Sequence, residues 1–216
     1  MEVLAIANQK GGVGKSTLAV NLGIEAVRGG RRVLLVDADT QSSATLFSAA
    51  REEGEPRFDT MQLVRPVLHR EIPRIGGAYE LVVIDVGGRD SGTFRSALVA
   101  ADRVLIPLGP SAADLWASDD VLGMLDEVSV GKSVRASAVF TKVVHGTRVA
   151  REALAELHEM LKERDVTLLD TAIHARVAWA QSFGEGRAVT EWAPSSAAAE
   201  ELRALSAELG ILGRAG

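Results

Sequence analysis

Short runs of apolar residues recur along the chain, and each has the length of a buried strand. The predicted strands are Val3–Ala7, Arg32–Val36, Met61–Val64, Leu81–Ile84, Val104–Pro107, Ala136–Thr141 and Val166–Leu169. Most of them are nearly continuous in apolar residues and do not alternate with polar ones. Continuous apolar runs are typical of parallel strands that are covered on both faces of a sheet.

Longer segments with the spacing of helices separate these strands. They are Lys15–Arg28, Ser42–Glu53, Asp114–Val128, Thr147–Arg164, Arg176–Phe183 and Ser196–Leu209. Strands that alternate with helices predict a three-layer α/β fold, in which a mostly parallel central sheet has helices on both faces. Gly54–Pro56 and Gly76–Gly77 are expected to be loops inside a single domain of residues 1–216.

Composition and charge narrow the possible functions. The chain contains no cysteine, which excludes disulfides, thiolate metal sites and iron–sulfur clusters. No apolar stretch approaches the roughly 18 residues of a membrane span, and no signal peptide is visible, so a cytoplasmic protein is expected. The net charge of −5 does not attract nucleic acid, but Val128–Arg151 has basic residues and no acidic ones. This segment is either a local basic face or a chance cluster.

A glycine-rich loop, Asn8–Thr17, connects the first predicted strand to the first predicted helix. Its glycines allow successive backbone N–H groups to point inward around a phosphate at the start of the helix. Lys15 then supplies a positive charge to the phosphates of ATP, and Ser16 supplies a hydroxyl to Mg²⁺. The usual phosphate-loop pattern has glycine at the position of Gln9, whereas this chain has a second lysine, Lys10, at the entrance of the loop.

Three aspartates lie at the ends of predicted strands. Asp37 and Asp39 follow the second strand, and Asp85 follows Leu81–Ile84. The C-terminal ends of parallel strands form the ligand-binding edge of an open α/β sheet. A carboxylate at that edge can hold Mg²⁺ through the waters of the ion. Each aspartate could instead cap a following helix, but the phosphate loop favours a role at the metal.

The pattern Lys-Gly-Gly-x-Gly-Lys-Ser over residues 10–16 resembles the deviant Walker A loop of the ParA/MinD superfamily of P-loop ATPases. The resemblance implies that Lys10 crosses a dimer interface to the partner's nucleotide, and that Asp39 orients or deprotonates the attacking water. It implies a catalytic set of Lys10, Lys15 and Asp39, and a Mg²⁺ site of Ser16, Asp37 and Asp85. The implied nucleotide contacts are Lys10, Gly11, Gly12, Val13, Gly14, Lys15, Ser16 and Thr17, with Thr141 and Lys142 near adenine.

The resemblance extends over nearly the whole chain. The segments 105–111 and 171–184 are similar to those of small ParA and ParF-like partition ATPases. Such proteins bind DNA non-specifically as ATP-bound dimers, through basic residues in their C-terminal half, and the matching candidates are Arg148, Arg151 and Arg176. Contacts to phosphate alone should be sensitive to salt. The chain starts with its first strand, so no N-terminal DNA-binding extension is expected.

Two positions depart from the pattern of the family. Thr40 stands where members usually have proline, and Val86–Asp90 replaces the turn that usually follows the third aspartate. Gly87 and Gly88 can still form a switch that senses the γ-phosphate. No role is assigned to Arg89 and Asp90.

The sequence therefore predicts an ATPase that partitions plasmid or chromosomal DNA. In this hypothesis ATP closes a homodimer, the dimer binds nucleoid DNA, and a ParB-like centromere-binding protein triggers hydrolysis and release. The first alternative is a related ATPase that positions a protein cargo.

Three further alternatives agree less well with the sequence. A MinD-like membrane switch would need a basic amphipathic helix, whereas Ala197–Leu209 is acidic, so no membrane partner is expected. A ligase of the dethiobiotin synthetase or cobyrinate amidase type would need a second substrate pocket, for which no residues stand out. A non-enzymatic scaffold would need a broken site, yet the phosphate loop and the aspartates are all present.

Overall fold

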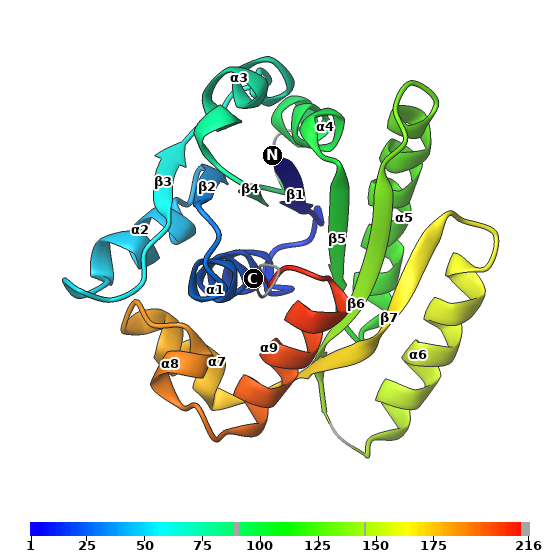
Figure 1. The fold of residues 1–216 in the computed structure, drawn as a ribbon. Helices are drawn as coiled ribbons and strands as arrows, with labels where there is room; N and C mark the ends of the chain where they lie inside the picture. The colour runs from blue at the N-terminus through cyan, green and yellow to red at the C-terminus, as the bar shows by residue number, and fades with distance from the viewer. Residues whose placement is uncertain (89–90, 145, 213–216) are drawn as a thin grey trace.

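The computed structural model describes residues 1–88, 91–144 and 146–212, and of residues 112–117 it describes the backbone alone. Arg89 and Asp90 lie outside these ranges. The strands are β1 (Glu2–Ile6), β2 (Val33–Ala38), β3 (Asp59–Gln62), β4 (Leu81–Val86), β5 (Arg103–Leu108), β6 (Arg135–Val143) and β7 (Val166–His174). They pair in parallel, in the order β3-β2-β4-β1-β5-β6-β7. The predicted parallel α/β sheet is confirmed (Figure 1).

Helices cover both faces of this sheet (Figure 1). One layer contains α1 (Lys15–Arg28), α2 (Ser43–Ala50), α7 (Val177–Gly184), α8 (Val189–Trp192) and α9 (Ala197–Glu208). The other layer contains α3 (Leu68–Ile75), α4 (Ser91–Ala100), α5 (Ala112–Ser129) and α6 (Arg148–Leu161). None of the helices in the described ranges combines the length and the apolar character that crossing a bilayer requires.

Each apolar strand supplies side chains to both cores, because successive residues of a strand point to opposite faces. In β1, Val3 and Ala5 pack under α3 to α6, whereas Leu4 and Ile6 pack under α1 and α9. The other central strands divide their residues in the same way. This two-sided burial is the reason that the strands are continuous in apolar residues.

The strand order places the predicted phosphate loop beside the predicted carboxylates. β4 lies between β1 and β2, although it follows both along the chain. Asp85 of β4 is therefore in register with Asp37 of β2 on one side and with Ile6 at the end of β1 on the other. The sequence predicted each of these strand ends separately, and the sheet brings them to one level of its C-terminal edge.

Several predicted boundaries were wrong. The helix expected over Ser42–Glu53 ends at Ala50, and the helix expected over Thr147–Arg164 spans Arg148–Leu161. The strand expected at Met61–Val64 lies two residues earlier, as β3. Part of the expected loop Gly76–Gly77 is a 3₁₀ turn. The short helices α3, α4 and α8 were not predicted, since each is short and buries only a few apolar side chains, and α3 contains a proline, Pro73, which usually marks the end of a helix.

β7 is longer than the predicted strand Val166–Leu169, because it continues to His174. The polar residues Asp170 and Thr171 interrupt its apolar pattern, and the pairing with β6 is irregular there. Glu208 of α9 accepts hydrogen bonds from the backbone N–H groups of Asp170 (2.6 Å) and Thr171 (3.1 Å). This contact comes from a distant segment and leaves no local signal in the sequence.

The predicted core-packing role of the last helix is confirmed. Leu202, Leu205 and Leu209 are buried against α1 and the sheet. The acidic side chains of α9 are also used inside the fold, since Glu201 and Glu208 both accept hydrogen bonds from backbone N–H groups of β7. The apolar face of α9 is therefore not available to a lipid bilayer.

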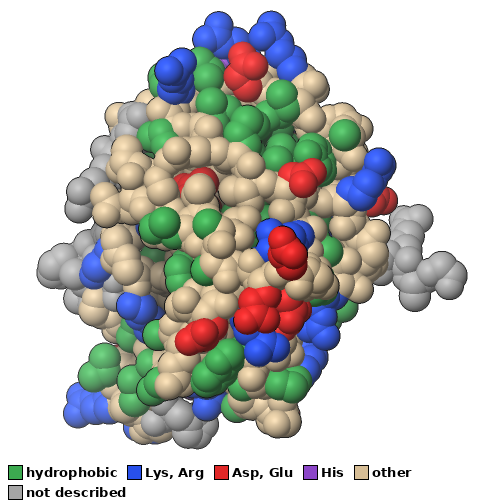
Figure 2. Space-filling model, turned by 90° about the vertical axis from the view of Figure 1, so that its left-hand side faces the viewer, with side chains coloured by type: hydrophobic (Ala, Val, Ile, Leu, Met, Phe, Trp, Pro, Cys, Tyr) green, Lys and Arg blue, Asp and Glu red, His purple; other side chains and the backbone are tan. Residues whose placement is uncertain are grey.

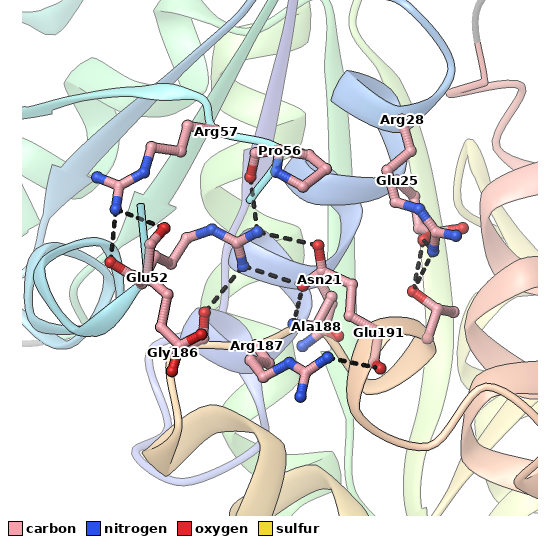
Figure 3. Close-up of polar contacts among 12 residues, drawn as sticks. Asn21, Glu25, Arg28, Glu52, Pro56, Arg57, Gly186, Arg187, Ala188 and Glu191 are labelled. Atoms are coloured by element: carbon pink, nitrogen blue, oxygen red, sulfur yellow. Dashed lines mark hydrogen bonds and ion pairs between the residues drawn. The ribbon is translucent and has the colours of Figure 1, made fainter. Parts of the chain in front are cut away.

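A buried ion pair joins the end of α2 to the segment that contains α7 and α8. The guanidinium of Arg51 lies 2.9 Å from a carboxylate oxygen of Glu191, and the two side chains are only 1% and 6% exposed. Arg51 also donates to the carbonyl oxygens of Pro56 and Gly186. Figure 3 shows the contacts around Glu191, Pro56 and Gly186, and beside them Asn21 of α1 accepts a hydrogen bond from the backbone N–H of Val189. The C-terminal third of the chain is thus held against α1 and α2 by polar contacts.

Replacing Glu191 with alanine is expected to lower the free energy of unfolding by about 3–5 kcal/mol, because Arg51 would stay buried without its countercharge. Urea unfolding followed by circular dichroism measures this loss. Glu159 is the matched control, because it pairs with Lys162 on the exposed surface of α6 and its replacement by alanine should cost less than about 1 kcal/mol. Equal losses in the two variants would contradict the structural role of the buried pair.

Candidate functional site

A cavity of about 940 Å³ opens at the C-terminal edge of the sheet. The loops that follow β1, β2 and β4 line one part of it, and the ends of β6 and β7 with α7 line the other. The predicted site residues that line it are Gly11, Gly12, Val13, Gly14, Lys15, Ser16, Thr17, Asp39, Thr141, Lys142 and Arg176. The structure therefore brings together the predicted phosphate loop, one aspartate and the candidates from the C-terminal half.

The loop between β1 and α1 has the backbone geometry of a phosphate cradle. Gly12 and Gly14 have φ angles of 78° and 99°, in the left-handed region that glycine adopts without strain. The helix α1 begins directly after Gly14, so its unpaired N–H groups and the positive end of its dipole face the cavity. This arrangement favours an anion at the start of α1.

Lys15 is held inside this loop. Its side chain is 7% exposed, and its ammonium group donates to the carbonyl oxygen of Lys10 at 2.9 Å. Burial lowers the pKa of Lys15, whereas the nearby carboxylates of Asp85 and Asp39 raise it. A bound phosphate would supply the further negative charge that this buried ammonium lacks.

Two residues that the sequence reasoning did not assign to this role fasten the loop to neighbouring strands. Asn8 is fully buried, donates to the carbonyl oxygen of Pro107 at 2.8 Å, and accepts a hydrogen bond from the backbone N–H of Lys10. The hydroxyl of Thr141 lies 3.0 Å from the carbonyl oxygen of Val13 and 3.2 Å from that of Leu108. The hydroxyl of Thr141, which was expected near adenine, is thus engaged in holding the loop. The only sequence signal for Asn8 was its position at the start of the glycine-rich loop.

Asp85 is the most unusual group of the site. Its carboxylate is fully buried, and neither oxygen has a hydrogen-bond partner of normal geometry in the described part of the chain. Burial raises the pKa of Asp85 to about 7, while the hydroxyl of Ser16 favours the ionised form and the charge of Asp37 disfavours it. A buried carboxylate without partners is costly, and a nearby cation would remove that cost.

The donor set around Asp85 fits Mg²⁺. Ser16 offers a hydroxyl and lines the cavity, and the buried carboxylate of Asp85 lies behind it, close enough for Ser16 and Lys15 to favour its ionised form. The described residues contain no group of three or more His, Asp or Glu side chains that could hold a metal ion. Few protein ligands are expected for an ion that takes most of its coordination from phosphate oxygens and water.

Asp37 has a different environment from the one predicted for a metal ligand. One of its oxygens accepts hydrogen bonds from the backbone N–H and the hydroxyl of Thr45, both at 2.8 Å, and the other accepts from the backbone N–H of Asp39 at 3.1 Å. These contacts fix the first turn of α2 and the start of the Asp39 loop. Both oxygens of Asp37 are thus engaged by groups of the protein, and Thr45 was missed because it has no motif of its own.

Asp39, after β2, and the turn after β4 line the cavity next to the phosphate loop. Asp39 accepts a hydrogen bond from the backbone of Gln41 through one oxygen and lines the cavity. Gly87 packs against Asp39, and a Cβ atom at Gly88 would lie only 2.0 Å from the carbonyl oxygen of Gln9. Gly88 is therefore required by close contact with the phosphate loop, and Gly87 by close contact with Ala38 and Asp39.

Lys10 and Lys142, two lysines near the phosphate loop, direct their ammonium groups to different parts of the molecule. Lys10 does not line the cavity, although its neighbours Gln9 and Gly11 do, and its ammonium group contacts the hydroxyl of Ser111 at 3.4 Å. Lys142 has a left-handed φ of 55°, which is unusual for a residue with a Cβ. Its ammonium group lies 3.8 Å from the position that a Cβ atom of Gly12 would occupy, so its charge is beside the phosphate loop.

The basic residues of the segment Val128–Arg151 do not form one face. Lys132 and Arg135 pair with Asp102 and Glu2 at the N-terminal ends of the strands. Arg148 and Arg151 begin α6 at the opposite end of β6, and nine residues of strand span about 30 Å.

The three predicted DNA contacts differ in their surroundings. Arg148 is exposed and pairs with Glu152 of the same helix, and Arg151 is also exposed. Arg176 precedes α7 and forms an ion pair with Glu201 at 2.7 Å. The paired ends of β6 and β7, Val143 with His174, nevertheless place all three at one edge of the sheet.

The sequence pattern of the CobQ/CobB/MinD/ParA nucleotide-binding domain matches residues 4–189 of the chain. The chain is 36% identical over 194 residues to the maintenance of carboxysome distribution protein A of Gloeobacter kilaueensis, covering 88% of this chain and 84% of that protein. It is 32% identical to the chromosome-partitioning ATPase Soj of Thermus thermophilus, in an alignment that covers 95% of this chain and 94% of that protein. Its fold is similar to that of the septum site-determining protein MinD of Pyrococcus horikoshii in complex with Mg-ADP, with a TM-score of 0.77, 20% identity and coverage of 99% of both chains.

Gly88→Ala is expected to lower the free energy of unfolding by about 1–3 kcal/mol, because the added Cβ would overlap the backbone of Gln9. Gly77→Ala is the control, since a Cβ atom there has nothing within 4 Å and should change stability by at most about 1 kcal/mol. Urea unfolding of both variants measures the difference. If Gly88→Ala is tolerated as well as Gly77→Ala, the contact between the two loops does not exist in the folded protein.

Proposed function

The chain belongs to the CobQ/CobB/MinD/ParA nucleotide-binding domain family, and on that premise we propose that it is a dimerisation-dependent ATPase that partitions DNA. The T. thermophilus relative is a chromosome-partitioning ATPase, which supports this reading. We further propose that residues 1–216 act as one domain, since one sheet carries both cores. The observation that supports the ATPase most strongly is the buried, unpaired carboxylate of Asp85 beside a glycine-rich phosphate cradle.

The residues of the cavity have complementary tasks in this proposal. The backbone N–H groups of residues 11–17 and the ammonium of Lys15 bind the phosphates of ATP. Ser16 and Asp85 hold Mg²⁺, with Asp37 positioning the loop beside them. When bound, Mg²⁺ neutralises charge that develops on the transferred phosphoryl group. Asp39 uses one oxygen for the backbone of Gln41, and the other, Oδ2, has no hydrogen-bond donor in the described ranges and orients the attacking water.

The proposal also requires a second copy of the chain. Lys10 does not line the cavity of its own subunit, which supports a role for its charge at the nucleotide of a partner. A positive charge that arrives only on dimerisation would act as an arginine finger does, by stabilising the transition state alone. Turnover would then depend on the concentration of the protein.

Lys10→Ala is expected to lower kcat for ATP about 100-fold or more, with binding of ATP retained, because only the transition state loses a charge. Steady-state phosphate release measures this, and the specific activity of the unaltered protein should rise with its concentration. Lys162→Ala removes a lysine from the exposed end of α6 and should have no effect. Unchanged turnover in Lys10→Ala would exclude the proposed role of this lysine.

DNA binding is assigned in this proposal to the edge where β6 and β7 end. Arg148, Arg151 and Arg176 all lie in the segments that follow the C-terminal ends of β6 and β7. On the side of the molecule that carries α2 and β3, the acidic and basic side chains of the described residues are interspersed (Figure 2). Non-specific binding needs contacts to phosphate only, which arginine supplies without reading bases.

Asp39→Ala is expected to bind ATP without hydrolysing it, so that the ATP-bound dimer persists. The variant should therefore bind non-specific DNA with ATP, and not with ADP or without nucleotide. Affinity should fall steeply with salt, and adding Arg151→Ala should reduce the slope of log K against log salt by about 1. Arg135→Ala is the matched control, since Arg135 lies at the opposite end of β6 from Arg148 and Arg151. Equal weakening by Arg135→Ala would exclude the assigned surface.

The positioning of a protein cargo is the second candidate. It is favoured by the 36% identity to a carboxysome distribution protein. The two candidates share the ATP-dependent dimer and differ in the partner that stimulates hydrolysis. Stimulation by a ParB-like centromere-binding protein supports partition of DNA. Absence of DNA binding in every nucleotide state would favour the cargo function instead.

A further inference from the structure

The carboxylate of Glu201 in α9 accepts hydrogen bonds from one short segment, His174–Arg176, which includes the last residue of β7 and the loop that leads to α7. One oxygen accepts from the backbone N–H of His174 at 3.1 Å. The other lies 2.9 Å from Nδ1 of His174, 2.9 Å from Nε of Arg176 and 2.7 Å from Nη2 of Arg176. Both oxygens of a carboxylate that is only 12% exposed are therefore used to hold this loop.

The loop that Glu201 holds forms the wall of the cavity that faces the phosphate loop. His174, Ala175 and Arg176 all line the cavity, and Glu201 itself does not. On its inner side the N–H of Ala175 donates to the carbonyl oxygen of Val143 at 2.9 Å. β7 is the last strand of the sheet in the described part of the chain, so within those residues no strand lies against the outer side of the loop. Glu201 supplies support on that side.

We propose that Glu201 is a positioning residue for nucleotide binding, which holds the His174–Arg176 wall at the distance from the phosphate loop that the bound nucleotide requires. This inference rests on the proposed ATPase function. Glu201 acts through His174 and Arg176 and does not touch the nucleotide. A wall that must be ordered at the moment of binding costs affinity, whereas a wall held in place beforehand does not. The effect is therefore on affinity and not on the chemical step.

Glu208 provides a matched control on the same helix. It lies two helical turns after Glu201 on the same face of α9, and it also accepts backbone hydrogen bonds from β7. Its partners, Asp170 and Thr171, do not line the cavity. A glutamine at either position keeps the size of the side chain but has one acceptor oxygen in place of two. Both variants thus weaken the contact between α9 and β7, and only one of them affects the wall.

Titration calorimetry with Mg-ADP and Mg-ATP tests the proposal on the full chain. Glu201→Gln should raise Kd about tenfold, which corresponds to about 1.4 kcal/mol, and should raise KM for ATP by a similar factor with kcat changed less than about twofold. Glu208→Gln should leave Kd and KM unchanged, although thermal unfolding should show a loss of stability in both variants. Glu201→Asp, which keeps the charge on a shorter side chain, should fall between the unaltered protein and Glu201→Gln.

A double-mutant cycle separates this role from a general loss of structure. If Glu201 acts through its two partners, adding Glu201→Gln to a His174→Ala/Arg176→Ala variant should weaken binding less than it does in the unaltered protein, because only the hydrogen bond from the backbone N–H of residue 174 is left to lose. A Kd within about twofold of the unaltered protein in folded Glu201→Gln, or an equal rise in Glu208→Gln, overturns the inference and leaves the ATPase standing. If the unaltered protein binds neither nucleotide, the proposed function fails together with this inference.

Discussion

The burial of Asp85 is the constraint around which the rest of the site is arranged. Its carboxylate is at the end of a strand in the middle of the sheet, where water cannot solvate it. The neighbouring groups respond to that charge: Lys15 lies near enough for each to stabilise the charged form of the other, and Ser16 favours the ionised carboxylate. A buried charge that remains without full compensation in the protein alone is kept for a ligand, because its cost would otherwise be removed more simply by an apolar residue.

The opposite wall of the cavity depends on contacts that start far from it. The first turn of α2 is held to Asp37 by the hydrogen bonds of Thr45, and Arg51, directly after α2, is paired with Glu191 in the segment of α7 and α8. Gly186 of this segment packs so closely on α2 that a Cβ atom would lie 2.7 Å from the backbone of Ala50. A short helix thus connects the carboxylates at the phosphate end of the cavity with the segment that forms its far wall.

The acidic character of α9 has a structural explanation. Glu201 and Glu208 lie on the helix face that covers β7, and they accept hydrogen bonds from N–H groups of this edge strand. An edge strand with unpaired N–H groups can pair with another chain, and covering those groups prevents it. The same residues that make α9 unsuited to an anionic membrane therefore complete the sheet and support the cavity.

The sequence by itself determined the layered fold and the phosphate loop, because both depend on local patterns. Continuous apolar runs indicate strands that are buried on both faces, and glycines with a lysine at a fixed spacing indicate a phosphate cradle such as Gly12–Lys15. Both patterns can be recognised without the rest of the sequence. Only the tertiary structure decided that β4 lies between β1 and β2, that Asp37 is engaged with Thr45, and that Glu201 holds the far wall. These contacts join residues whose spacing along the chain carries no period or motif. The free energy that selects them comes from burial and hydrogen bonding in the folded state, which no local stretch of sequence contains.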